Sequence, residues 1–458
     1  MNTLIYTSAL GFFAMLLEVL NLRKIIIPAM VIGLAVVFGL NLQDWTHPQT
    51  YFGDMLEVSK FSVAFSGLSI FITIIIFMLA SEFYSDQENQ VSDYIAIMTF
   101  ILCGAIMMVS YANLVMLFLG IETLSIALYA MAGSKRFDLK SNEAGFKYFL
   151  MGSFASAFLL FGIALIYGTV HSFHISLIST YITQSSTLSP MFITGMCLIL
   201  FAMLFKVSAA PFHFWAPDVY EGSPALVTAF MSTLVKVAGF AAFYRLLTST
   251  FTFGTGISEM ILLIVTILTL FTGNLSALAQ DNFKRLLAFS GISHAGYMML
   301  LILSNKTFPA AALLYYSVAY ALSTLAAFAI ALPVFKSTGS ELISAFNGLG
   351  KKNPVLAACM SVAMLGLAGI PPFAGFFGKF FIFTEALQNG YFYTVLIAII
   401  NSIIGIYYYF KVILAMYGKP ANETNIENPL TYQLVMWLCV GLSLVLGVLP
   451  GMLTDLFN

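Results

Sequence analysis

The chain has 458 residues, of which 60% are hydrophobic and 9% are charged, and its mean hydropathy is +0.95. Soluble domains carry roughly 25% charged residues, so this composition excludes an ordinary soluble protein and indicates a membrane protein. The formal net charge of -1 gives no reason to expect nucleic acid as a partner.

Apolar runs of about 18 residues or more recur along the whole chain, and each can cross a hydrocarbon core of roughly 30 Å as a helix. The predicted fold class is therefore all-α, a polytopic membrane protein with about 14 transmembrane helices. The predicted spans cover residues 2–21, 25–42, 60–80, 93–110, 112–132, 144–168, 190–213, 224–248, 257–279, 284–304, 308–335, 354–388, 391–418 and 430–455.

Lysine and arginine gather in alternate loops of this pattern. Loops after odd-numbered spans carry eleven of these cations, and loops after even-numbered spans, counted with the span ends beside them, carry three, Lys60, Arg245 and Lys306. Cytoplasmic loops hold the excess of positive charge in membrane proteins. The pattern therefore predicts that both termini face away from the cytoplasm.

The remaining five cations fall within predicted spans, and all are lysines: Lys147, Lys206, Lys236, Lys379 and Lys411. A charged lysine at the bilayer centre costs about 2.5–3.5 kcal/mol on insertion scales. Burial can lower the pKa of a lysine toward neutrality, whereas arginine stays charged, so a buried lysine can carry a mobile proton. The alternatives are side chains that extend to the interface, for Lys147 and Lys411 near span ends, and buried ion pairs that hold helices together, for the deeper three.

Two further titratable residues lie in apolar spans. Glu122, in LFLGIETLSIALYA, is a carboxylate near the middle of the fifth span. Opposite charges within about 4–6 Å keep both groups ionised, and their separation lets both become neutral, so Glu122 is the predicted acid that acts with a lysine. His294, in FSGISHAGYMML, titrates near neutral pH and is predicted to relay protons between lysines; the alternative is a hydrogen-bonded core histidine.

Prolines interrupt two spans beside lysines. Pro211 follows Lys206, and Pro371 and Pro372 precede Lys379. Proline removes a backbone donor and frees carbonyls that hydrocarbon cannot satisfy. Discontinuous helices with polar residues at the break form ion sites in many transporters, so we expect a hydrated site at each break, with a packing kink as the alternative.

An internal repeat follows from two alignments. FLGIETLS (118–125) resembles FSGISHAG (289–296), and Pro-Phe occurs at 211–212 and again at 372–373. The predicted division is N-terminal helices 1–3 in residues 1–92, a first five-helix repeat in 93–248, a second in 249–418 and a C-terminal helix in 419–458. An odd number of helices per repeat makes the second copy inverted, and each copy contains one broken helix.

Four motifs in one order then carry a family resemblance: FKVSAAPFHFWAPDVYEGSP, TLVKVAGFAAFYRL, GNLSALAQDNFKRLLAFSGISHAGYMML and GIPPFAGFFGKF. They resemble the antiporter-like membrane subunits of respiratory complex I, the NADH-quinone oxidoreductase.

The resemblance implies a proton-translocating subunit and assigns roles along a proton-transfer path. Glu122 is the acid of the fifth helix, Lys206 its partner on the broken seventh, Lys236 the central lysine, His294 a connecting group and Lys379 the terminal lysine. Lys147 matches a position in the cytoplasmic input. At Lys411 the family usually has arginine, so no proton-carrying role is implied there.

The resemblance also implies what lies in other chains. No nicotinamide, flavin or cluster motif occurs in the sequence, so no cofactor is expected here, and FMN and iron-sulfur clusters are expected in partner subunits. The expected partners are the sister antiporter-like subunit M, the small subunits K and J, lipid and protons, in a bacterial cytoplasmic (inner) membrane. Two alternatives stay open: a subunit of a multisubunit sodium/proton antiporter, and a purely structural membrane scaffold.

Overall fold

The computed structural model describes residues 2–85, 90–185, 187–249, 256–304, 309–420 and 426–457. The chain divides into two compact units. Unit 1 comprises Met1–Phe77, Gln87–Trp215 and Leu234–Ile261, and unit 2 comprises Met78–Asp86, Ala216–Thr233 and Leu262–Asn458.

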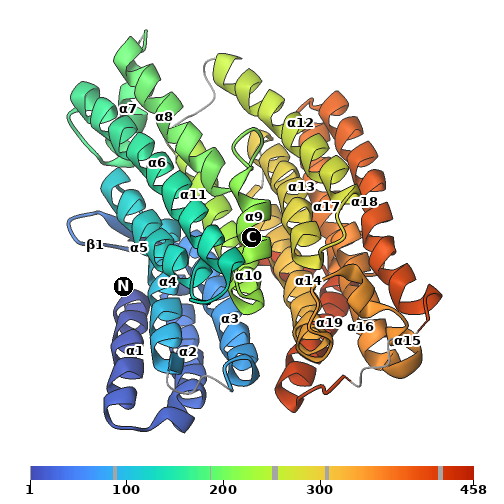
Figure 1. The fold of residues 1–458 in the computed structure, drawn as a ribbon. Helices are drawn as coiled ribbons and strands as arrows, with labels where there is room; N and C mark the ends of the chain where they lie inside the picture. Colours follow the sequence, from blue (N-terminus) through green and yellow to red (C-terminus); the bar gives the residue numbers. More distant parts are fainter. Residues whose placement is uncertain are drawn as a thin grey trace. The chain divides into compact units, whose positions relative to one another are not determined.

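Unit 1 is a bundle of long apolar helices. In it α6 lies against α8 and α5, and α4 lies against α1, α5 and α11 (Figure 1). Its helices are α1 (Asn2–Val19), α2 (Arg23–Gln43), most of α3 (Lys60–Phe83), α4 (Val91–Ser110), α5 (Leu114–Ala132), α6 (Leu139–Val170), α7 (Ile175–Gln184), α8 (Pro190–Lys206) and α11 (Lys236–Ser249). A short antiparallel hairpin, β1 (Gln49–Tyr51) and β2 (Leu56–Val58), joins α2 to α3 after the 3-10 turn η1 (Asp44–Thr46).

Unit 2 is organised around α14, which packs against α16, α17 and α19. Its long helices are most of α12 (Gly256–Leu278), α13 (Phe283–Leu303), α14 (Pro309–Thr338), α16 (Pro354–Ala368), α17 (Ala374–Gln388), α18 (Phe392–Gly418) and α19 (Leu430–Val448). Shorter elements are α9 (Trp215–Gly222), α10 (Ala225–Phe230), α15 (Leu349–Lys352), α20 (Gly451–Thr454), the 3-10 turns η4 (Ile343–Phe346) and η5 (Asp455–Phe457), and the π-helical turn η3 (Met231–Val235), which leads into α11.

The predicted all-α polytopic fold is confirmed. Among the described residues, 12 helical segments are long and apolar enough to cross a membrane. Two shorter apolar helices, α8 and α16, are the first halves of the predicted spans 190–213 and 354–388. The total of fourteen spans, the two inverted repeats and the four predicted segments stay predictions. Lys306 lies outside the described residues.

Some elements differ from the prediction. The last span was expected to continue to residue 455, but α19 ends at Val448, because Pro450 has no amide hydrogen to extend the helix. Helix α6 begins five residues earlier than expected, where the Asp138 side chain accepts a hydrogen bond from the Lys140 amide at 3.0 Å. Helix α7 and the hairpin are too short to produce a spanning hydropathy signal, and the sequence analysis missed both.

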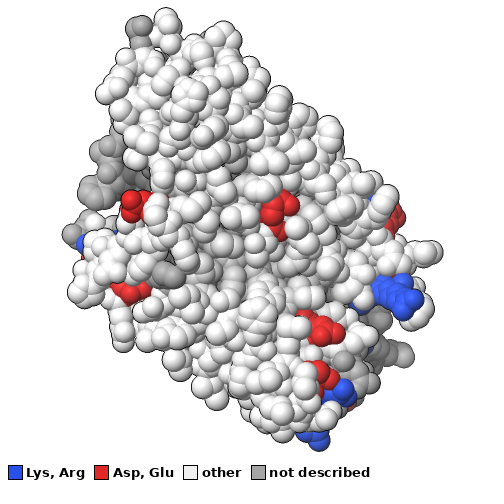
Figure 2. All heavy atoms as spheres, turned by 90° about the vertical axis from the view of Figure 1, so that its left-hand side faces the viewer, with Lys and Arg blue, Asp and Glu red and all other residues white. Residues whose placement is uncertain are grey.

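The outward surfaces of the helices are apolar. Phe146 and Phe154 on α6 are 63% and 64% exposed, and Tyr407 on α18 is 67% exposed. Figure 2 shows a face on which a few scattered charged side chains interrupt a surface of uncharged residues. Such surfaces contact lipid tails in a membrane, where they need no polar partner.

The second break packs tightly against α19. A Cβ atom added to Gly447 would lie 1.8 Å from the carbonyl oxygen of Pro372, so only glycine permits this approach of the two backbones. Gly441, six residues earlier in the same helix, has open space where its Cβ would stand.

Replacing Gly447 by alanine is therefore expected to destabilise unit 2. The backbone at the break has to move, and overpacking typically costs about 1–3 kcal/mol. The measurement is the thermal melting of the detergent-solubilised protein, with Gly441→Ala as the matched control. Equal melting temperatures for the two variants would contradict the packing described here.

Candidate functional site

The first break has a defined geometry at its start. Helix α8 ends at Lys206, and Ser208 adopts a left-handed conformation with φ 59°. The amide of Ala209 donates to the Leu204 carbonyl at 2.9 Å, and the amide of Ser208 donates to Phe205 at 3.0 Å. This is the hydrogen-bond pattern of a Schellman C-cap, which satisfies carbonyls that the ended helix leaves free.

A tryptophan side chain completes this cap. The indole nitrogen of Trp215, the first residue of α9, donates to the Phe205 carbonyl at 3.1 Å. Its ring stacks on Tyr148 of α6, with ring centroids 4.7 Å apart and planes 6° from parallel. The break is therefore held by specific contacts from both sides.

Lys206 points its ammonium group into unit 1. The residue is 7% exposed, and Nζ donates to the Ser125 hydroxyl of α5 at 2.7 Å. Glu122 lies one helical turn before Ser125, is half-buried, and accepts a hydrogen bond from the Ser156 hydroxyl of α6. No ion pair of 4.0 Å or less joins Glu122 to Lys206, both of which the structure describes.

A small cavity lies where these side chains meet. Its volume is about 20 Å³, and its lining includes Ser125, Ser156 and Lys206. Tyr129 and Tyr148 also line it, with ring centroids 4.8 Å apart. A cavity of this size holds about one water molecule, which can bridge hydroxyl groups that do not touch.

Lys236 occupies a second buried position in unit 1. It is 3% exposed and is the first residue of α11, directly after the π-helical turn η3. A π-helical turn has one more residue than an α-helical turn, so it changes which side of the helix the following residues face, and such turns are frequent at functional sites. Sequence periodicity gave no signal for it.

The second break repeats the cap but places its lysine differently. Helix α16 ends at Ala368, and Gly369 follows with φ 81°; its amide donates to Gly366 at 3.1 Å, and the Ile370 amide donates to Leu365 at 3.0 Å. Glycine adopts this left-handed conformation without steric cost.

Lys379, in α17 after the break, supplies the side-chain donor. Nζ donates to the Ala368 carbonyl at 2.7 Å and to the Ser402 hydroxyl at 2.9 Å. It also lies 4.9 Å from the ring centroid of Tyr297, a cation–π contact. The residue is 6% exposed.

His294 lies in unit 2 within a set of buried hydroxyl groups. Its Nδ1 is 2.6 Å from the Tyr316 hydroxyl and its Nε2 is 3.1 Å from the Tyr409 hydroxyl. The Tyr409 hydroxyl is also 2.5 Å from Ser290 Oγ. Both ring nitrogens of His294 are thus hydrogen-bonded, so a change of tautomer can move a proton across the ring.

The two remaining lysines have different surroundings. Lys147 pairs with Glu143 at 2.6 Å, and its side chain is 34% exposed. Lys411 pairs with Asp281 at 2.7 Å and has a side chain that is 31% exposed. These partly exposed ion pairs fit the alternative in which the two side chains extend to the membrane interface. Their exposure also distinguishes Lys147 and Lys411 from the three buried lysines.

The sequence analysis missed the hydroxyl-bearing partners. They are Ser125 and Ser156 in unit 1 and Ser290, Tyr316, Ser402 and Tyr409 in unit 2. A polar residue on an otherwise apolar span was the available signal, but serine and threonine are also common where helices pack closely. Within the described ranges, no group of three or more His, Cys, Asp or Glu side chains could hold a metal ion.

A family model and relatives of the same length match this chain. Residues 112–405 match the family model described as NADH:quinone oxidoreductase/Mrp antiporter, transmembrane. Two relatives, both NADH-quinone oxidoreductase subunit N, come from Flavobacterium psychrophilum and Flavobacterium johnsoniae. They are 48% identical to this chain over 458 and 472 residues, and each alignment covers 100% of both proteins.

Solved structures share the fold. A chain of respiratory complex I from Thermus thermophilus with bound aureothin matches with a TM-score of 0.85 and 32% identity, covering 99% of this chain and 98% of that one. A chain of the Mrp complex from Dietzia sp. DQ12-45-1b matches with a TM-score of 0.86 and 19% identity, covering 99% and 95%. At that identity the Mrp likeness concerns the fold alone.

Fold and buried lysines together define an antiporter-like membrane subunit. The chain belongs to the family of subunit N of NADH-quinone oxidoreductase, respiratory complex I. It is accordingly a multi-pass membrane protein, with other complex I subunits as its partners. The resemblance to the antiporter-like membrane subunits of complex I that the sequence motifs carry is confirmed.

Replacing Trp215 by phenylalanine tests the first cap. The change keeps a ring to stack on Tyr148 but removes one of two donors to the Phe205 carbonyl, which still accepts from the Ser208 amide. The loss of one such hydrogen bond costs about 0.5–1.5 kcal/mol. We expect amide hydrogen exchange in residues 204–216 to become roughly tenfold faster, measured by mass spectrometry.

The matched control is Trp437→Phe on α19, where the tryptophan is 54% exposed. That variant should leave exchange at the break unchanged. Unaltered exchange in Trp215→Phe would show that the indole hydrogen bond does not stabilise the cap.

Proposed function

We propose that the chain translocates protons as subunit N of NADH-quinone oxidoreductase and couples NADH:quinone electron transfer in partner subunits to proton pumping. One observation carries the proposal: the Lys206 ammonium is buried at a helix break, bonded to a serine hydroxyl and not to the carboxylate of Glu122. A titratable cation in this position can change protonation state when the carboxylate approaches or withdraws.

Lys206 and Glu122 act as a switchable pair. Approach of the carboxylate stabilises the charged ammonium, and withdrawal favours release of its proton. The cavity beside Ser125 gives room for a water molecule to accept that proton. One pKa unit equals about 1.4 kcal/mol, and one charge crossing 100 mV requires about 2.3 kcal/mol, so a change of a few units supplies the needed energy.

The proposed path has a fixed order of carriers. A proton enters from the cytoplasmic side near Lys147, reaches Lys206, passes to Lys236 and His294, and leaves outward from Lys379. The tyrosine hydroxyls on both ring nitrogens of His294 favour a relay over a structural role, because each nitrogen has a group with which to exchange a proton.

The remaining parts of the proposal concern the surroundings. FMN and iron-sulfur clusters belong to partner subunits, so energy arrives through contacts with neighbours. The proposed neighbours are subunits M, K and J in a bacterial inner membrane, with both chain termini on the periplasmic side, as the loop charges predict. Lipid covers the apolar outer faces.

A sodium/proton antiporter subunit is the second candidate. The Mrp complex shares the fold, but the relatives with 48% identity along the whole chain are complex I subunits, which favours complex I. A third candidate, the structural scaffold, uses the buried lysines only to hold helices together.

Replacing Lys206 by methionine or Glu122 by glutamine is expected to abolish NADH-driven proton uptake by inverted membrane vesicles while the complex still assembles. The exposed Lys351, changed to methionine, is the control and should retain uptake. Unchanged pumping in the Lys206 and Glu122 variants would end the proposal. If Glu122→Gln reduces the amount of assembled complex more than it reduces proton transport, the structural scaffold is favoured.

Purification through an affinity tag on this chain separates the first two candidates. We expect flavin fluorescence, iron-sulfur absorbance and NADH oxidation to co-purify with the chain. A preparation that exchanges sodium for protons and lacks all three signals would favour the antiporter.

A further inference from the structure

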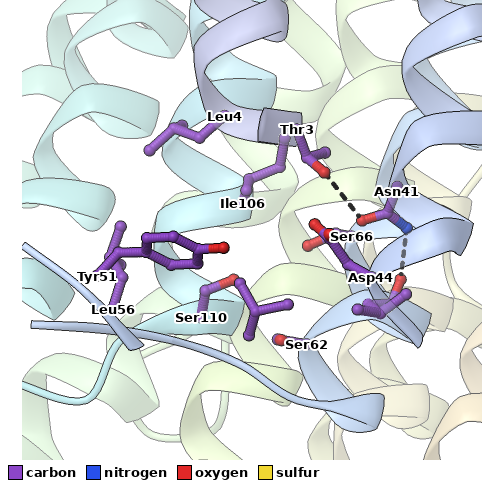
Figure 3. A pocket seen from close by; sticks show the side chains of 12 residues that line it. Thr3, Leu4, Asn41, Asp44, Tyr51, Leu56, Ser62, Ser66, Ile106 and Ser110 are labelled. Atoms are coloured by element: carbon purple, nitrogen blue, oxygen red, sulfur yellow. Dashed lines mark hydrogen bonds between the residues drawn. The ribbon is translucent and has the colours of Figure 1, made fainter. Parts of the chain in front are cut away.

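A polar pocket in unit 1 takes no part in the path proposed above. Its volume is about 30 Å³, enough for about two water molecules. It lies where the start of α1, the end of α2, the hairpin, the start of α3 and the end of α4 come together (Figure 3).

The inner wall of the pocket is built from buried polar groups. Asn41 is 2% exposed; its side-chain nitrogen donates to the Val63 carbonyl at 2.9 Å, and its oxygen accepts from the Thr3 hydroxyl at 3.4 Å (Figure 3). Ser66 and Ser110 are 2% and 7% exposed, line the pocket, and have no hydrogen-bond partner in the described part of the chain. Both residues line the pocket, so water in the pocket is an available partner for their hydroxyl groups.

The outer wall connects the pocket to the molecular surface. Asp44 and Tyr51 line it from that direction, and both are partly exposed. Tyr51 belongs to the hairpin, which lies at one end of the helices, so water can enter from the membrane face that carries the hairpin.

A polar stripe leads from the pocket into the bundle. Ser62, Ser66, Ser69 and Thr73 occur at spacings of four, three and four residues along α3, and none is more than 2% exposed. This spacing places them on one buried side of the helix. The Ser69 hydroxyl donates to the Phe65 backbone carbonyl and the Thr73 hydroxyl donates to the Ser69 backbone carbonyl, each at 2.8 Å. Each hydroxyl oxygen can still accept a hydrogen bond from water.

Helices α3 and α11 lie beside each other at the hairpin end. Phe61 of α3 stacks on Tyr244 of α11, with ring centroids 5.5 Å apart. Glu57, just before α3, forms an ion pair with Arg245 of α11. The start of α3 and the end of α11 therefore share one membrane face.

The stripe reaches the depth of the central lysine. Lys236 lies eight residues before Tyr244 on α11, and Ser69 lies eight residues after Phe61 on α3. At 1.5 Å per residue both lie about 12 Å from the stacked rings, in the same direction into the membrane.

We propose that the pocket and the α3 stripe form a hydrated access route that connects Lys236 with the membrane face bearing the hairpin. Water occupies the route, and the proton that Lys236 gains or loses moves along it. The route rests on the proposed function, since it requires that Lys236 carries a proton, and it departs from the path given there because it opens outward at Lys236 as well as at Lys379. By the loop charges, the hairpin face is the outward one.

Cysteine accessibility in the assembled complex tests the route directly. Ser66→Cys and Ser69→Cys are exposed to Ag⁺, a thiol-reactive ion small enough for the pocket, in right-side-out and in inverted vesicles. Blocked thiols are then counted by alkylation after denaturation, with the parent protein as the blank for its four native cysteines.

Leu68→Cys is the matched control, because Leu68 lies at the same depth on α3, is buried, and faces away from the stripe. We expect the cysteines at positions 66 and 69 to react at least fivefold faster than the one at 68, from the hairpin face only. Equal reactivity of all three, reactivity from the opposite face, or an inert cysteine at 69 would overturn the route and indicate dry helix packing.

Proton uptake separates the route from the proposed function. We expect Ser69→Val to lower NADH-driven uptake several-fold and Ser69→Thr to retain it. If Lys236→Met pumps normally, the proposed carrier role fails whatever the labelling result. If Lys236→Met is inactive and Ser69→Val pumps normally, the route fails and the carrier role stands.

Discussion

The constraint on which this structure depends is the cost of an ammonium group inside a membrane. Lys206, Lys236 and Lys379 are each less than 10% exposed. A charge in this environment persists only where polar groups surround it. The chain meets that requirement with hydroxyl groups and a backbone carbonyl: Lys206 donates to the Ser125 hydroxyl, and Lys379 donates to the Ser402 hydroxyl and the Ala368 carbonyl. Neutral partners stabilise an ammonium less strongly than a carboxylate does, which is what the proposed proton-carrying role of these lysines requires.

The helix breaks exist for the same reason. A helix that stops within hydrocarbon leaves carbonyl groups free, and each needs a donor. Both breaks begin with the same backbone cap, but the side-chain donor differs. Trp215 serves the first break and Lys379 serves the second. At the second break the proposed terminal carrier is therefore also a structural donor, whereas Lys206 at the first break is free to bond across to α5.

The N-terminal helices have a partly polar interior. Helices α1 to α3 lie outside the segment matched by the family model, which begins at residue 112. Yet α3 carries a buried row of hydroxyl groups, and the pocket at its start is lined by residues from α1, α2 and α4. The hydroxyls of Ser69 and Thr73 are bonded to carbonyls of their own helix, so their burial is compatible both with helix packing and with the proposed route.

The amino-acid sequence alone determined the membrane class, the approximate limits of the long helices and the two breaks, because hydropathy and proline act locally along the chain. It also singled out Glu122, Lys206, Lys236, His294 and Lys379, since a charged or titratable residue in an apolar span is conspicuous. Only the tertiary structure decided what these residues touch. Ser125, Ser156 and Tyr409 become partners through the packing of helices far apart in sequence, and no local pattern distinguishes them from ordinary packing residues. The pocket at the start of α1 likewise forms from residues of several helices and the hairpin, and hydropathy gives no signal for the π-helical turn before Lys236.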